Sequence, residues 1–199
     1  MAVTAQQVQE LRRKTGAGVM DCKRALAECG GDLEQAALAL RKQGMARADA
    51  RMERQAQEGV IASYIHAGGR IGVLVEVNCE TDFVARTDEF QALARNLAMH
   101  IAAEQPRWVR PEDVPEAILE QEKDVYRSLA VKEGKPGKVI EKIVEGRLAK
   151  FHGEVCLLDQ QYVRDDEKTV SEVVREAIAH LGENIVVRRF VRYQLGEGE

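Results

Sequence analysis

The sequence predicts an α+β protein in which a small helical module precedes a core of a small antiparallel sheet with several helices. Two observations carry this prediction. Residues 1–44 hold three segments whose apolar residues recur at helical spacing, each followed by glycine. Later segments, 60–66, 71–79 and 184–195, show the two-residue alternation of strands. We therefore divide the chain into a three-helix module (1–44), a linker (45–57) and a core (58–199).

The three N-terminal helices have recognisable ends. Thr4 and Gln7 fit a capping box, and the first helix ends at Thr15. Asp32 caps the third helix, and we expect Gly44 to lie just past its end. The linker that follows is rich in Ala, Arg and Glu and contains neither Gly nor Pro, so we expect a semi-rigid, helix-favouring spacer.

The core begins with two strands that Gly68 and Gly69 join in a tight hairpin. A helix is predicted from Thr87 to about Glu104, another after Pro115, and a third through Phe151. A capping box at residues 169–172 then begins the last helix, which Gly182 ends before the third strand. No heptad run indicates a coiled coil.

Composition excludes several classes of protein. With 45% hydrophobic residues the 199-residue chain can bury a core, and it has no apolar run long enough to cross a bilayer. The N-terminus lacks the features of a signal peptide, so we expect a soluble, cytoplasmic protein. Four scattered cysteines argue against a zinc site or a disulfide framework, and the net charge of −4 argues against broad nucleic-acid binding.

The most informative stretch is residues 80–86, ETDFVAR, which joins an apolar strand to an amphipathic helix. Thr81 or Asp82 can cap a short helical turn, and Thr87 offers a second helix start. Two starts so close together suggest a separate turn that carries Asp82, Phe83 and Val84 at the surface. Phe83 is then either a core residue or part of an acidic and aromatic tip that enters a pocket on another protein.

Three further residues are candidates for partner contacts. Met20 and Lys23 follow the flexible Gly16 and Gly18, although Met20 could equally belong to the module's core. His100 lies beside the apolar stripe of its helix, where it is either a hydrogen-bonded structural histidine or a partner contact. The spacing yields no carboxylate pair, nucleophile–base pair or metal cluster, so we expect no covalent chemistry, metal or cofactor.

Four segments together resemble one family. They occur in the family's order and span nearly the whole chain: residues 11–26 (LRRKTGAGVMDCKRAL), 77–86 (VNCETDFVAR), 98–102 (AMHIA) and 183–190 (ENIVVRRF). These segments resemble signatures of translation elongation factor Ts. Val19 departs from the pattern, because the family often has Met there. The resemblance implies a guanine-nucleotide exchange factor that acts on the GTPase elongation factor Tu, and a ubiquitin-associated-like N-terminal module.

The resemblance also implies a role for the corner. The tip formed by Thr81, Asp82, Phe83 and Val84 would enter the GTPase near its Mg²⁺ and phosphate site, with Phe83 as the wedge. Longer family members carry a second core repeat and an inserted coiled coil, whereas this chain resembles the short members. That similarity and the undersized sheet imply a homodimer with paired sheets, and a 2:2 complex with elongation factor Tu.

Two other classes of function remain open from the sequence. One is a non-catalytic adaptor that binds a protein partner through its N-terminal helical module. The other is an RNA-binding protein that uses Arg188, Arg189 and Arg192, which the negative total charge disfavours. Neither alternative explains the acidic and aromatic corner, and we expect no direct contact with nucleic acid or membrane.

Overall fold

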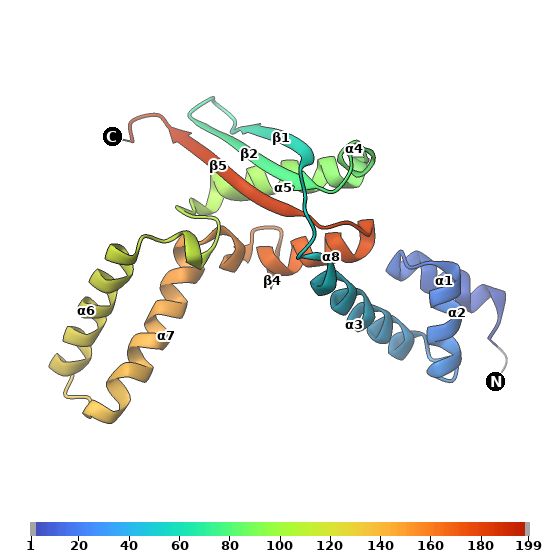
Figure 1. Cartoon of the computed structure of the whole chain (residues 1–199), viewed down its shortest axis with the longest axis horizontal. Helices are drawn as coiled ribbons and strands as arrows, with labels where there is room; N and C mark the ends of the chain where they lie inside the picture. The colour runs from blue at the N-terminus through green and yellow to red at the C-terminus, as the bar shows by residue number, and fades with distance from the viewer. Residues whose placement is uncertain (1–2, 198–199) are drawn as a thin grey trace. The chain divides into compact units, whose positions relative to one another are not determined.

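The computed structural model describes residues 3–197 (Figure 1). The chain forms two compact units. One contains the residues up to Gly59 together with Asn78–Phe90 and Val174–Val186, and the other contains Val60–Val77, Gln91–Val173 and the residues from Val187 onward. Helices and a small sheet are both present, so the predicted α+β class is confirmed. Within the described residues, no helix combines the length and apolar character that a membrane crossing needs.

Three helices open the chain: α1 (Ala5–Thr15), α2 (Val19–Glu28) and α3 (Leu33–Arg51). The predicted caps are confirmed. Thr4 and Gln7 form the capping box, and the Asp32 carboxylate accepts hydrogen bonds from the N–H groups of Glu34 and Gln35, both at 2.9 Å. The apolar stripes meet in one small core: Val8, Leu11, Cys22, Ala25, Leu26, Ala36 and Leu40.

Helix α3 does not end at Gly44, and this part of the prediction is wrong. The helix continues to Arg51 because the residues after Gly44 are strong helix formers. The glycine serves close packing instead: a Cβ added at Gly44 would lie 3.3 Å from the Cβ of Ala179 on α8. The first half of the expected linker is therefore helix. The domain boundary at residue 44 stays a prediction.

The sheet has three strands in the order β1 (Glu58–Ile65), β2 (Ile71–Cys79) and β5 (Val186–Gln194). Gly68 and Gly69 have φ angles of 88° and 69° and form the predicted hairpin turn. The Leu195 N–H donates to the Arg70 carbonyl at 2.8 Å, so the end of β5 lies beside the start of β2. The two strands are therefore antiparallel.

Two helices follow the hairpin. The short α4 (Asp82–Ala85) precedes α5 (Asp88–Glu104), so the expected double start is confirmed. Helix α5 buries its apolar stripe: Phe90, Leu93, Ala94, Leu97, Ala98 and Ile101. On the covered side of the sheet, the buried side chains are those of Ala62, Val73, Val75, Val77 and Val187. Arg192 on β5 donates to the Ala102 carbonyl near the end of α5 at 3.4 Å.

The two helices predicted after Pro115 and through Phe151 are confirmed as α6 (Glu116–Lys132) and α7 (Gly137–Val155), and they pair as a helical hairpin that no heptad pattern indicated (Figure 1). A 3₁₀ turn, η1 (Pro111–Asp113), precedes it and another, η2 (Leu157–Asp159), follows it. Ion pairs connect the two helices, from Arg127 to Glu141 at 2.9 Å and from Arg147 to Glu133 at 3.2 Å. Charged side chains thus contribute to the pairing of α6 with α7, and a search of the sequence for apolar repeats alone would not indicate this pairing.

A second, two-stranded sheet, β3 (Gln161–Tyr162) with β4 (Asp165–Thr169), is absent from the prediction. Strand β4 has the sequence DDEKT, whose acidic residues and lysine are depleted in strands. Helix α8 (Val170–Leu181) follows directly. Its predicted capping box is confirmed, since the Thr169 N–H donates to Glu172 at 2.9 Å and the Glu172 N–H donates to Thr169 at 3.2 Å.

Candidate partner-binding site

The predicted tip, Thr81–Val84, comprises the N-cap and the first three residues of helix α4, and threonine side chains hold this helix at both ends. The Thr81 hydroxyl accepts a hydrogen bond from the Val84 N–H at 3.4 Å and so caps the start of the helix. At the other end, the Thr87 hydroxyl donates to the Val84 carbonyl at 2.8 Å and accepts from the Phe90 N–H at 3.3 Å. Because Phe90 is fully buried, these bonds attach the tip to the core.

Phe83 projects from this tip into solvent, with 82% of its surface exposed. The alternative that Phe83 is a core residue is therefore wrong. Asp82 is half-exposed and forms an ion pair with Arg86 at 2.9 Å, one helical turn further on. Thr81 and Val84 are partly buried. The tip thus presents an aromatic ring beside a carboxylate and a guanidinium, a combination suited to a pocket with apolar and polar walls.

Glu183 holds the tip from the turn between α8 and β5. Its Oε2 accepts hydrogen bonds from the N–H groups of Glu80 at 3.1 Å and Thr81 at 3.0 Å, and its Oε1 accepts from the Thr81 hydroxyl at 2.6 Å. Sequence reasoning missed this residue, because the two partners lie 102 positions apart. The available signal was that Glu183 begins the fourth of the resembling segments.

Cys79, the last residue of β2, also contacts the start of the tip. The thiol is fully buried and donates to the Thr81 carbonyl at 3.1 Å. Burial, with a smaller contribution from the negative charge of Glu183, raises the pKa of the Cys79 thiol to about 11. Cys79 is therefore a neutral structural group at physiological pH.

Met20 and Lys23 lie on α2, separate from the tip. Met20 is 73% exposed, so the alternative that it belongs to the module's core is wrong. Lys23 is exposed as well. The preceding turn depends on Gly16, whose φ of 67° favours glycine. Of the predicted contact residues, Met20 and Lys23 on α2 and Phe83 on α4 therefore have side chains open to solvent.

His100 is fully buried, and its ring nitrogens both have partners. The Val163 N–H donates to Nδ1 at 3.2 Å, so Nε2 carries the proton and donates to Gln160 Oε1 at 3.0 Å. The Gln160 amide in turn donates to the carbonyls of Glu104 and Glu154. Burial lowers the pKa of His100. This geometry supports the interpretation of His100 as a structural histidine.

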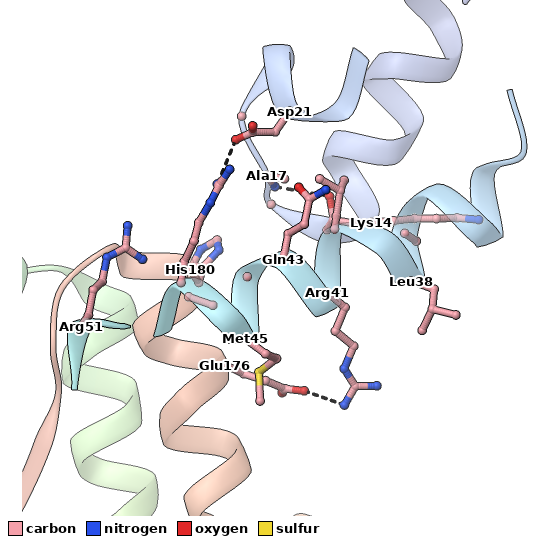
Figure 2. Close-up of a pocket in the computed structure, with 18 residues that line it drawn as sticks. Lys14, Ala17, Asp21, Leu38, Arg41, Gln43, Met45, Arg51, Glu176 and His180 are labelled. Atoms are coloured by element: carbon pink, nitrogen blue, oxygen red, sulfur yellow. Dashed lines mark hydrogen bonds and ion pairs between the residues drawn. The ribbon is translucent and has the colours of Figure 1, made fainter. Parts of the chain in front are cut away.

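A cavity of about 680 Å³ lies where the turn before α2, helix α3 and helix α8 meet (Figure 2). Two ion pairs cross it, from Arg47 to Asp21 at 3.4 Å and from Arg41 to Glu176 at 3.0 Å. The hydrogen bond from Arg47 lowers the pKa of the Asp21 carboxyl. Neither Met20 nor Lys23 is among the residues that line the cavity, so it is separate from the predicted contacts.

Comparison with known proteins gives a consistent answer. Residues 44–197 match the family described as Elongation factor TS. Curated proteins named elongation factor Ts are 59% identical in Geobacter metallireducens and 58% in Geobacter sulfurreducens, each over 100% of this chain and 92% of the relative. The relative of that name in Carboxydothermus hydrogenoformans is 57% identical over 98% of this chain and 90% of its own length. The α+β fold and these matches define a translation elongation factor. The chain belongs to the elongation factor Ts family.

Proposed function

We propose that the protein is a guanine-nucleotide exchange factor that promotes GDP release from elongation factor Tu in the cytoplasm. Family membership supports the class of activity. The observation that supports the mechanism is the 82% exposure of Phe83 on a tip held by Glu183, Thr81 and Thr87. A large apolar side chain that is exposed to solvent contributes nothing to the hydrophobic core of the protein and remains available to a partner.

In the proposed mechanism the Thr81–Val84 tip enters the GTPase and displaces the groups that hold Mg²⁺. Bound Mg²⁺ and the phosphate-binding loop hold GDP tightly, so disturbing them weakens the nucleotide without covalent chemistry. The coupling is reciprocal. Binding of the exchange factor lowers the affinity of the GTPase for GDP, and binding of an incoming nucleotide lowers the affinity of the GTPase for the exchange factor by the same ratio. The exchange factor is thereby released for another cycle.

Phe83 alone is too small for this task. An acceleration of about 10⁴-fold requires roughly 5.5 kcal/mol, whereas burial of one Phe contributes about 1.5–3 kcal/mol. Met20 and Lys23 supply a second contact surface in our proposal, on a ubiquitin-associated-like module. Met20 brings an exposed, flexible apolar side chain and Lys23 a charge.

The decisive experiment measures release of fluorescent GDP from elongation factor Tu with wild type and Phe83→Ala. We expect the variant to lose most of the acceleration, while Val131→Ala, an exposed apolar position on α6, keeps it. Equal rates for wild type and Phe83→Ala would contradict the mechanism. If the protein bound the GTPase without accelerating release at all, the adaptor alternative would apply instead.

We further propose that the protein is a homodimer that forms a 2:2 complex with the GTPase. The outer face of the three-stranded sheet supports this proposal, because it exposes Ile61, Ile65, Leu74 and Tyr193 by between 49% and 71%. A Cβ added at Gly72 would lie 3.1 Å from the Ile65 Cδ1 atom, so Ile65 crosses the neighbouring strand on this face. A second sheet is a suitable cover for such an apolar face.

A further inference from the structure

We propose that Glu183 is a positioning residue, which fixes the direction in which the tip presents Phe83 to a partner. The inference rests on the proposed function, because it concerns how the tip acts on the GTPase. Its basis is a set of hydrogen bonds among three segments that are distant in the sequence: residues 52–54, 80–81 and 183–184. We call this set the carboxylate clasp.

Glu183 uses both of its carboxylate oxygens on the tip. Two successive backbone N–H groups, of Glu80 and Thr81, donate to one oxygen, and the Thr81 hydroxyl donates to the other at 2.6 Å. Hydrogen bonds to a charged acceptor are roughly twice as strong as neutral ones. The backbone at the start of the tip is therefore fixed by a side chain from another element.

The clasp is reciprocal. Glu80 Oε1 accepts a hydrogen bond from the Asn184 N–H at 2.7 Å, while Glu80 Oε2 lies 3.6 Å from the Arg54 guanidinium. Each glutamate thus binds the backbone beside the other. Asn184, only 2% exposed, adds a third segment, because its side-chain amide donates to the carbonyls of Met52 at 3.2 Å and Arg54 at 2.6 Å.

The Thr81 hydroxyl carries this constraint to Phe83. It has one proton and two lone pairs, and here the proton goes to Glu183 while a lone pair accepts the Val84 N–H. Glu183 therefore fixes the rotamer that caps α4. A helix of four residues has no stability of its own, so its direction depends on this cap. Phe83 is the second residue of that helix.

The test is a double-mutant cycle on GDP release, with Glu183→Gln and Phe83→Ala alone and together. The glutamine keeps the size of the side chain but removes the charge and replaces one acceptor oxygen by a donor. Misplacement of a functional group by about 1 Å can reduce a rate by up to about a hundredfold, so we expect roughly tenfold to hundredfold slower release for Glu183→Gln. In the Phe83→Ala background the same change should have less than about a twofold effect, because there is no ring left to position.

If Glu183 had a purely structural role, the double-mutant cycle would show independent effects of Glu183→Gln and Phe83→Ala on the rate of GDP release. If the double variant slowed GDP release by the product of the two single effects, the positioning inference would be overturned. It would also be overturned if Glu183→Gln released GDP at the wild-type rate while Phe83→Ala was slow. If Phe83→Ala itself released GDP at the wild-type rate, the proposed function would fail first and the inference with it. Glu145→Gln, at an exposed site on α7, controls for the loss of one negative charge.

Thr81→Val provides a second route if Glu183→Gln does not fold. Valine has nearly the shape of threonine but lacks the hydroxyl that links Glu183 to the cap of α4. We expect slower release for Thr81→Val, and again no further loss in combination with Phe83→Ala. Wild-type release rates for Thr81→Val would overturn the proposed route through the hydroxyl.

Discussion

Phe83 and Phe90 lie seven positions apart in the sequence and differ completely in environment. Phe83 is 82% exposed and Phe90 is fully buried. We expect Phe83→Ala to change the free energy of unfolding by no more than about 0.5 kcal/mol, and Phe90→Ala to lower it by about 3–5 kcal/mol. Urea unfolding followed by circular dichroism measures both. A loss above about 2 kcal/mol for Phe83→Ala would show that its ring packs against the protein.

The environment of His100 makes stability depend on pH. Burial lowers its pKa in the folded state, and the Val163 N–H points at Nδ1, so the neutral ring is favoured. The unfolded chain has the ordinary histidine pKa of about 6.5 and binds the proton first. The stabilisation is therefore complete above about pH 6.5 and falls as the pH decreases below that value.

We expect the urea midpoint of the wild-type protein to fall between pH 7 and pH 5 more steeply than that of His100→Gln. Parallel slopes for wild type and His100→Gln would show that His100 does not titrate differently in the two states.

The cysteines should differ in reactivity. Burial raises the pKa of Cys79 to about 11 and that of Cys156 to about 12, and the thiolate is the reactive form. Cys29 is only partly buried. We expect a thiol reagent at pH 8 to modify Cys29 in the native protein and Cys79 and Cys156 only after unfolding, as peptide mass spectrometry would report. Early modification of Cys79 would contradict the structure of the corner.

Single caps should have measurable effects at the scale of an element. Asp32 satisfies two N–H groups at the start of α3, so Asp32→Ala should lower the free energy of unfolding by about 1 kcal/mol. Gln35→Ala is the control, because the backbone N–H that Asp32 binds is kept. Thermal unfolding followed by circular dichroism compares the two variants, and equal midpoints would exclude a contribution from the cap.

The elements that could be predicted from the sequence are those with local signals. Caps such as Thr4 and Asp32 act within three residues, and the stripe of α5 repeats within one helix. Gly44 misled the prediction because its packing partner, Ala179, is distant in sequence. Strand β4 was missed because its polar residues resemble a loop.

The same distinction applies to the candidate site. The short turn with Phe83 at the surface follows from two adjacent helix starts, and it is confirmed. Glu183 could not be found that way, since its hydrogen bonds join turns 102 positions apart. The contact roles of Met20 and Lys23 stay predictions, although both side chains are exposed.

The proposed homodimer gives a prediction at the scale of the whole molecule. Light scattering at micromolar concentration should report twice the chain mass of 22.2 kDa for wild type, and about one chain for Leu74→Glu. A charge at Leu74 would lie in the centre of an apolar interface at a high desolvation cost. Val131→Glu, at an exposed site on α6, should leave the dimer intact. A monomeric wild type would contradict the proposal.

Helix α3 runs without a break past Gly44. Its 19 residues extend about 28 Å at 1.5 Å per residue, and Asn184 grips the chain directly after its last turn. The helix therefore joins the module's core, at Ala36 and Leu40, to the segment that Asn184 binds, with no break in the backbone at Gly44.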